Sequence, residues 1–89
     1  MYNMEIAEIF EQVQFTLCDH LRVPPHLVAA TAELEDDLHI DSLDLAEICI
    51  LLEDTFDVEI DAAPEFHTVF DIAVYLQRRA PFSAQNLRT

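Results

Sequence analysis

The strongest constraint on the fold is the segment 42–56, in which apolar residues recur at intervals of three and four. Five of them form one stripe: Leu45, Ile48, Cys49, Leu52 and Phe56. This spacing places them on one face of an α-helix, because a helix makes a turn every 3.6 residues. A second apolar set lies beside the stripe, formed by Leu43, Ala46 and Ile50. We therefore expect a helix that is either buried on two sides or apolar on an exposed edge.

Two other segments share this periodicity. The first predicted helix runs from about Asn3 to Leu21 and ends before Pro24-Pro25, because proline lacks an N–H and restricts the residue before it. The last predicted helix opens at Thr68. Asp71 follows three residues later, in the spacing of a capping box.

The remaining segments complete the predicted domain. A short helix is expected at Ala62–Phe66, and residues 24–40 form a long loop between the first two helices. The loop's expected anchors to the core are Val28, Leu34, Leu38 and Ile40. Three long helices and one short helix, without strand alternation, predict an all-α fold. We expect a small up-and-down four-helix bundle over residues 1–80, with 81–89 as a disordered tail.

Charge narrows the range of partners. The 89 residues include 18 acidic and 4 basic side chains, a formal net charge of −14, and no Lys or Arg occurs between residues 23 and 77. Such a surface repels nucleic acid and anionic membranes, and it attracts basic protein surfaces. A solvated acidic face that only maintains solubility explains the same composition.

Missing residue types exclude several functions. The chain has no glycine, which excludes glycine-rich phosphate loops, and no lysine, which excludes Schiff-base chemistry. Cys18 and Cys49 fall within helical apolar patterns and are expected to be core residues. Residues 1–10 lack the basic start of a signal peptide, and no apolar run is long enough to span a bilayer. We therefore expect a soluble, cytoplasmic protein.

A serine at the start of the central helix is the main chemical feature. A helix beginning at Asp41 or Ser42 has unpaired backbone N–H groups and partial positive charge there. That end suits a phosphodiester attached to the serine oxygen. Asp41 can cap the helix, and Asp44 lies in its first turn. Taken alone, these residues are better explained by helix capping than by a modification site.

The sequence around the serine resembles the acyl carrier proteins. Residues 34–60 read LEDDLHIDSLDLAEICILLEDTFDVEI. The matching positions are Asp41-Ser42-Leu43, Glu47, Glu53-Asp54, Phe56, Val58 and Ile60. The resemblance extends over about residues 4–79. It implies a carrier that is not itself an enzyme, in which a separate phosphopantetheinyl transferase esterifies Ser42 with 4′-phosphopantetheine from coenzyme A. The terminal thiol of that arm would carry acyl groups as thioesters.

The resemblance also implies roles for other residues. Basic partner enzymes would bind the acidic and exposed apolar positions Asp41, Leu43, Asp44, Ala46, Glu47, Ile50 and Asp54. The acyl chain would shelter among the core positions Ile48, Cys49, Leu52 and Phe56, for which plain core packing is the alternative. Weak divalent-cation sites in the family match Asp36, Asp41 and Asp44, and in part Glu53, Asp57 and Glu59. Solvated acids explain both clusters, and no metal is expected as part of the function.

Two departures from the family pattern favour a specialised carrier of fatty-acid or polyketide-type biosynthesis. His39 replaces the usual glycine two residues before Asp41, and the segment 61–67 is short and contains Pro64. Because the chain is short and begins with Met1, we expect a discrete carrier rather than a module of a larger synthase. Nothing in the sequence indicates a homo-oligomer, so we expect a monomer.

Three alternatives remain open. A peptidyl carrier is the nearest, although Asp41 and the acidic composition favour the acyl class. An acidic helical adaptor would keep the charge and the bundle but would not need Ser42. A hydrolase using Ser42 with His39 has no glycine-based nucleophile elbow and no evident third member of a triad.

Overall fold

Three helices and one helical turn make up the described part of the chain. The structure is a computed structural model, and it describes residues 5–60 and 66–79. Its elements are α1 (Ile6–Leu21), the 3₁₀ turn η1 (Pro25–Leu27), α2 (Ser42–Phe56) and α3 (Val69–Arg78). The predicted all-α class is confirmed. The short helix expected at Ala62–Phe66 falls, apart from Phe66, outside the described residues, so the four-helix count stays a prediction.

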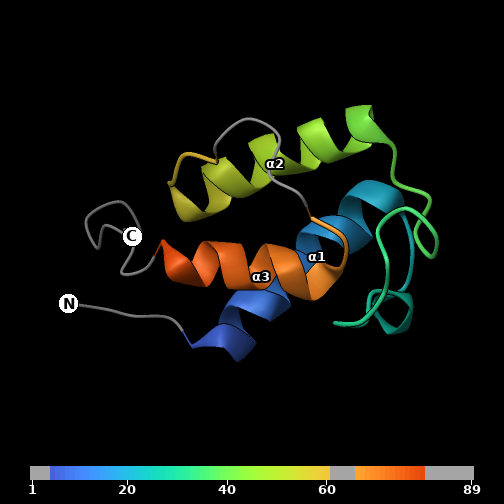
Figure 1. The fold of residues 1–89 in the computed structure, drawn as a ribbon, viewed down its shortest axis with the longest axis horizontal. Coiled ribbons are helices and arrows are strands. Elements are labelled where there is room, and N and C mark those ends of the chain that lie inside the picture. The colour runs from blue at the N-terminus through green and yellow to red at the C-terminus, as the bar shows by residue number, and fades with distance from the viewer. Residues whose placement is uncertain (1–4, 61–65, 80–89) are drawn as a thin grey trace.

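Helix directions are compatible with the predicted up-and-down arrangement, in which a short helix between α2 and α3 would leave these two parallel (Figure 1). Figure 1 shows α1 running opposite to both α2 and α3, while α2 and α3 run in the same direction. The chain between them, residues 57–68, explains how this is reached. Twelve residues can extend about 40 Å, whereas the 15-residue α2 is about 22 Å long. The connection is therefore long enough to return along the whole of α2 before α3 begins.

Helix α1 is the common packing partner of the other two helices. It packs closely against α3 and also against α2, whereas the backbones of α2 and α3 approach each other at few points. The core is formed by Ile9, Val13 and Leu17 of α1, Ile48, Leu52 and Phe56 of α2, and Val69, Ile72, Ala73 and Leu76 of α3. Burying such side chains contributes about 1.5–3 kcal/mol each.

The two cysteines depart from their predicted place. Both are half-buried, and Cys18 packs against the core from its edge. Cys49 lies beside the fully buried stripe of α2, which is centred on Ile48 and Leu52. Burial raises the pKa of both thiols, and the nearby carboxylate of Glu53 raises that of Cys49 further.

Helix ends are completed without glycine. Arg22 after α1 and Asp57 after α2 both adopt the left-handed conformation, with φ of 61° and 55°. Their N–H groups donate to the carbonyls of Cys18 and Glu53. The third described residue with positive φ is His39, at 58°. The position where the family pattern has glycine therefore does take a glycine-like conformation.

The start of α3 agrees with its predicted capping box, whereas α1 begins later than predicted. Thr68 and Asp71 form the predicted capping box: Thr68 N donates to Asp71 Oδ2 at 3.0 Å, and Asp71 N donates to Thr68 Oγ1 at 3.2 Å. Helix α1 begins at Ile6 rather than near Asn3, which lies outside the described residues. The carboxylate of Glu8 accepts the N–H of Glu5 at 3.1 Å, and this contact fixes the later start.

The long loop is anchored as the sequence predicted. Val28, Leu34 and Ile40 are buried, and Leu38 packs against the core from the edge. The loop begins with the single helical turn η1. Its carbonyls at Pro25 and Val28 accept the side-chain amide of Gln14, both at 3.1 Å. We call this pair of hydrogen bonds the Gln14 clamp. No local sequence signal predicts it, because Gln14 lies eleven or more residues away from its acceptors.

The loop is also fixed to the start of α3. Backbone N–H groups of Leu34, Val69 and Phe70 donate to the carbonyls of His67, Ala32 and Ala30 at 2.9, 3.1 and 3.0 Å. An isolated antiparallel bridge pairs Glu33 with Thr68 at the same place. The N-terminus of α3 is thus covered by the loop, whereas no described residue covers the start of α2 in this way.

Candidate functional site

The site is built on the first turn of α2. The Asp41 backbone is extended, with φ of −94°, and its Oδ1 accepts the Asp44 N–H at 2.8 Å. The Asp41 carbonyl also accepts the N–H of Leu45 at 2.9 Å. Asp41 is therefore the N-cap, and the helix begins at Ser42 as the sequence predicted.

Ser42 has a free side chain in this setting. The residue is exposed, and its hydroxyl makes no hydrogen bond to any described residue. Within the same part of the chain, no group accepts the backbone N–H of Ser42 or Leu43. The helix end thus offers unpaired donors and partial positive charge beside a hydroxyl that water can reach. Both features suit a phosphodiester on the serine oxygen.

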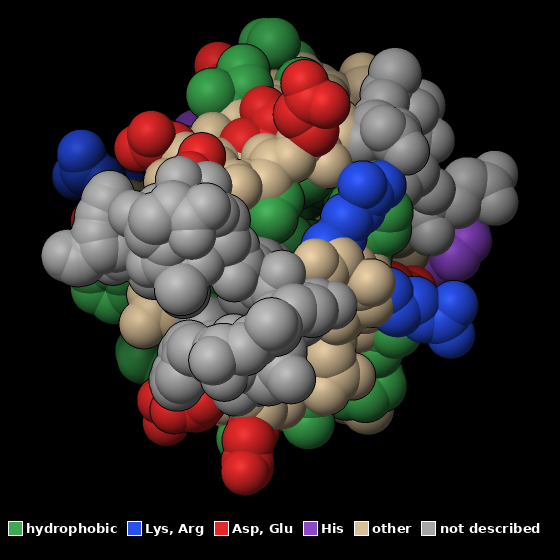
Figure 2. All heavy atoms as spheres, turned by 90° about the vertical axis from the view of Figure 1, so that its left-hand side faces the viewer, with side chains coloured by type: hydrophobic (Ala, Val, Ile, Leu, Met, Phe, Trp, Pro, Cys, Tyr) green, Lys and Arg blue, Asp and Glu red, His purple; other side chains and the backbone are tan. Residues whose placement is uncertain are grey.

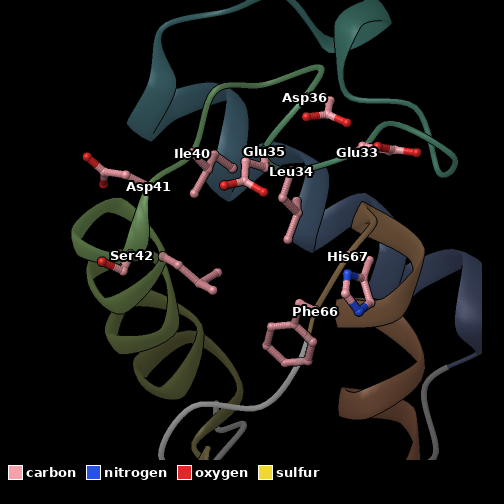
Figure 3. A pocket seen from close by; sticks show the side chains of 10 residues that line it. Glu33, Leu34, Glu35, Asp36, Ile40, Asp41, Ser42, Phe66 and His67 are labelled. Carbon is pink, nitrogen blue, oxygen red and sulfur yellow. The ribbon is translucent and has the colours of Figure 1, made fainter.

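A hollow of about 430 Å³ opens beside Ser42. Figure 3 shows Asp41 and Ser42 on one side of it, Phe66 and His67 on the other, and Leu34 and Ile40 between them. Leu45 completes the apolar lining, and Glu33, Glu35 and Asp36 form an acidic rim. The hollow combines an apolar floor with polar groups at its edge, as expected of a site for a flexible, partly apolar ligand.

The rim is electrostatically strained. A hydrogen bond with the Asp36 side chain, together with the charges of Asp36 and Asp37, raises the pKa of Glu33. The Glu33 backbone N–H donates to Asp37 Oδ2 at 2.8 Å, so local hydrogen bonds hold these acids together despite their repulsion. Sequence reasoning did not identify Glu33, Phe66 or His67 as neighbours of Ser42, because they lie 9 to 25 residues away along the chain.

The acidic face of α2 is open to solvent. Asp41, Leu43, Ala46, Glu47, Ile50 and Asp54 are exposed, and Asp44 is half-exposed. Leu43 and Ile50 keep 67% and 62% of their surface in contact with water, which is far more than apolar core residues retain. Leu51, which the sequence did not single out, adds a further exposed apolar side chain at 43%.

Charge is distributed unevenly between the helices. Figure 2 looks at the end of the molecule where α2 and α3 finish, and red acidic side chains gather over α2 at the top of this view. The described arginines lie at other places: Arg22 follows α1, and Arg78 and Arg79 end α3. Within the described chain, no helix is both long enough and apolar enough to cross a membrane.

The predicted pocket residues divide by burial. Ile48, Leu52 and Phe56 are fully buried against α1 and α3, as core packing requires, whereas Cys49 is half-buried. None of the four lines the hollow beside Ser42, whose α2 walls are Asp41, Ser42 and Leu45.

The predicted cation clusters do not converge in the described residues. Asp41 is engaged as the helix cap, and Glu53 Oε2 accepts the Ile60 N–H at 2.8 Å. The convergent group of possible ligands is instead His20, Asp44 and Glu47. His20 was missed because it lies on α1, more than 20 residues before its partners, so no sequence spacing marks the group.

Comparison with known proteins identifies the family. The family described as "Phosphopantetheine attachment site" matches residues 11–74. Curated relatives include the acyl carrier protein of Afipia carboxidovorans, 40% identical over 84% of this chain and 98% of its own length. The acyl carrier proteins of Phenylobacterium zucineum and Bdellovibrio bacteriovorus are 37% and 38% identical, over 83% and 80% of this chain and 96% and 94% of their own lengths.

These matches define first the class and then the family. Residues 11–74 form a phosphopantetheine-attachment domain. The chain belongs to the acyl carrier protein family, whose members are carriers rather than catalysts, and its prosthetic group is 4′-phosphopantetheine. When bound, this group supplies a terminal thiol that holds acyl chains as thioesters. The unpaired N–H groups and the free hydroxyl at Ser42 fit its phosphodiester.

Proposed function

We propose that Ser42 is the attachment point of the 4′-phosphopantetheine arm. The observation that carries this proposal is the exposed Ser42 hydroxyl, free of hydrogen bonds to the described chain, at the first residue of a capped helix. Attachment forms a bond from Ser42 Oγ to the β-phosphorus of coenzyme A and breaks that phosphorus's bond to the leaving adenosine 3′,5′-bisphosphate. The hydroxyl proton passes to the transferase.

The chain's own residues position the serine but do not activate it. Asp41 is engaged with the Asp44 N–H, and no described histidine hydrogen-bonds to Ser42. His39 lies three residues away, but a general base must reach the proton that it removes. The base must therefore come from the transferase, and this speaks against the alternative of a hydrolase.

The exposed face of α2 is the proposed docking surface for that transferase and for acyl-processing enzymes. It combines the acids Asp41, Asp44, Glu47 and Asp54 with the apolar side chains Leu43, Ala46 and Ile50. Basic partner surfaces would be steered to it by charge, and the apolar residues would be buried on contact. Leu43, one residue from the attachment serine, is the central apolar contact of this surface.

We further propose that the carrier works in the cytoplasm, as a monomer, in fatty-acid or polyketide-type biosynthesis. A specialised role is supported by His39, which takes the left-handed conformation without being a glycine. Its imidazole adds a bulky side chain three residues before the attachment serine. The acyl chain is proposed to shelter near Ile48, Cys49, Leu52 and Phe56, reached from the hollow beside Ser42.

Intact mass is the test of attachment. Purified protein is measured before and after incubation with coenzyme A and a broad-specificity phosphopantetheinyl transferase, beside Ser42→Ala and Thr55→Ala. Thr55 is a matched control because its hydroxyl lies on the same helix and donates to the Leu51 carbonyl at 2.9 Å. Wild type and Thr55→Ala should gain one phosphopantetheine, and Ser42→Ala none.

Two outcomes would overturn the proposal. A gain in Ser42→Ala would place the arm elsewhere. No gain in wild type, under conditions that modify a known carrier, would favour the acidic adaptor, with Ser42 acting only as the first helical residue. Offering aminoacyl and acyl forms of coenzyme A in the same assay, followed by partner enzymes of either class, separates an acyl from a peptidyl carrier.

A further inference from the structure

One cluster of possible metal ligands joins α1 to α2 outside the attachment site. His20 Nε2 lies 3.3 Å from Glu47 Oε1 and 3.9 Å from Asp44 Oδ1. The three ligand atoms all lie within 4.8 Å of one another. Asp44 and Glu47 are three residues apart and so share a face of α2, while His20 comes from the last turn of α1. Three donors from two separate helices therefore meet at one point.

We propose that His20, Asp44 and Glu47 bind a divalent transition-metal ion of the Zn²⁺ class. Ligands about 2.0–2.1 Å from a tetrahedral Zn²⁺ are about 3.3–3.4 Å apart. The His20–Glu47 separation already has this value, and the His20–Asp44 separation exceeds it by about half an ångström. The third separation, between the Asp44 and Glu47 carboxylates, is within 4.8 Å, so binding requires these two side chains to move closer together. The partial exposure of all three residues leaves the fourth position open to water.

Ligand chemistry selects the class of ion. Ca²⁺ and Mg²⁺ take oxygen ligands, whereas an imidazole nitrogen beside two carboxylates suits Zn²⁺ and its neighbours. The histidine separates this site from the acid-only clusters that the sequence suggested. Substitution of His20 alone should therefore abolish binding at this site while leaving every carboxylate unchanged.

The charge around the site favours a cation. No Lys or Arg occurs between residues 23 and 77, and no arginine pairs with Asp44 or Glu47 in the described chain. Two carboxylates and a neutral imidazole carry two negative charges, which one divalent ion balances. The competing arrangement is a protonated His20 forming an ion pair with the same two acids. This ion pair would need no metal, and the cluster would then bind divalent ions no more tightly than other surface carboxylates do.

An ion here would affect both stability and docking. It would fasten the end of α1 to the start of α2, and it would occupy two acids of the proposed docking surface. A bound ion should therefore weaken the attraction of basic partners. This last consequence rests on the proposed function, whereas ion binding itself does not.

Calorimetric titration of the full-length protein with ZnCl₂ at neutral pH tests the site. Wild type is compared with His20→Gln and Glu47→Gln, and with two matched controls outside the cluster. His26→Gln removes an exposed histidine of η1, and Asp54→Asn removes an exposed acid of α2. We expect one saturable Zn²⁺ site in wild type and in both controls. His20→Gln and Glu47→Gln should each lower the Zn²⁺ affinity at least about tenfold. Even substitution of residues that only hydrogen-bond to metal ligands usually costs that much.

Further readouts keep the result decisive. In nitrogen-15 NMR, Zn²⁺ should shift the His20 imidazole nitrogens and leave those of His26 in place, and excess Mg²⁺ should not reverse the shift. Ser42→Ala should bind Zn²⁺ as wild type does, so failure of this site and failure of the attachment site are told apart. Circular dichroism checks that each variant is folded. If His20→Gln disturbs packing, Glu47→Gln still tests the site, because it changes an exposed residue. Equal affinity of His20→Gln and wild type, or no saturable binding, would overturn the proposal and leave an ion pair only.

Discussion

The N-termini of α2 and α3 use the same capping chemistry and have opposite surroundings. In each helix a side-chain oxygen of the N-cap residue accepts the backbone N–H three residues later. Asp41 accepts from Asp44 in α2, and Thr68 accepts from Asp71 in α3. The start of α3 is covered by the loop, through backbone hydrogen bonds that involve Leu34, Val69 and Phe70. The start of α2 has no such cover, and the first helical residue there is Ser42.

This difference shows how one helix start becomes structural while another stays open for the modification that we propose at Ser42. Both ends carry partial positive charge and have first N–H groups that find no partner within their own helix. At α3 the chain itself occupies that end, and the loop is anchored as a result. At α2 the end faces solvent beside a hollow, where an added phosphodiester meets no competing group. The four predictions below test whether the contrast is real, starting with the largest expected effect.

The first prediction compares the same substitution on the covered and the open side. Leu34→Ala removes a side chain that is only 3% exposed in the loop that covers α3. It should lower the free energy of unfolding by about 2–5 kcal/mol. Leu43→Ala, at the open start of α2, should change it by less than about 0.5 kcal/mol. Urea unfolding measures both, and equal losses would contradict the contrast.

The second prediction concerns the caps themselves. Thr68→Ala and Asp41→Ala should each cost about 1 kcal/mol, because both remove an N-cap acceptor. Their local effects should differ. Amide hydrogen exchange at Leu34 should accelerate more in Thr68→Ala than in Asp41→Ala, because its acceptor is the His67 carbonyl beside the altered cap. The same acceleration in both variants would mean that the loop is not held by the α3 cap.

The third prediction concerns acid. N–H groups of His67 and Thr68 donate to the Asp71 carboxylate and hold its pKa below the ordinary value. The charged form is therefore favoured by folding. Its stabilisation is complete above the ordinary Asp pKa of about 3.9 and is lost as the pH falls through the lowered pKa.

The Asp71→Asn variant provides the measurement for this prediction. Asparagine keeps an acceptor oxygen but does not titrate, so the unfolding free energy of the variant should fall less steeply than that of wild type between about pH 5 and 2. Denaturant curves across that range make the comparison. Parallel pH profiles would show that Asp71 contributes nothing through its charge.

The fourth and smallest prediction concerns strain just before α2. His39 holds φ of 58°, which costs a residue with a Cβ about 1–2 kcal/mol, and among residues 66–79 none has positive φ. His39→Gly should stabilise the fold by about 0.5–1 kcal/mol, after the greater flexibility of glycine in the unfolded chain is subtracted. His39→Ala keeps the Cβ and should bring no gain. Thermal unfolding distinguishes the two, and a destabilised glycine variant would refute the strain.

Much of the fold followed from local sequence. The stripe of Leu45, Ile48, Leu52 and Phe56 predicted α2, the Thr68–Asp71 spacing predicted the start of α3, and loop residues such as Leu34 were identified as anchors. Each of these signals lies within one or two helical turns. The chemistry of the site was equally local, because Asp41, Ser42 and Leu43 are consecutive.

Long-range features were outside the reach of the same reasoning. The Gln14 clamp on η1, the hollow between Ser42 and His67, and the group formed by His20, Asp44 and Glu47 all join residues far apart in the chain.

The sequence by itself determined which segments become helices and where they are capped. It also placed the Ser42 hydroxyl at a helix start. Periodicity, capping and charge act over a few residues, so each of these features can be read locally. Tertiary structure decided which of two similarly capped helix starts stays open, because only the path of the loop settles which N-terminus the chain covers. The same packing brought His20 to the acids of α2. Side chains from different helices meet only when the helices are packed, so no spacing along the chain can encode their meeting point.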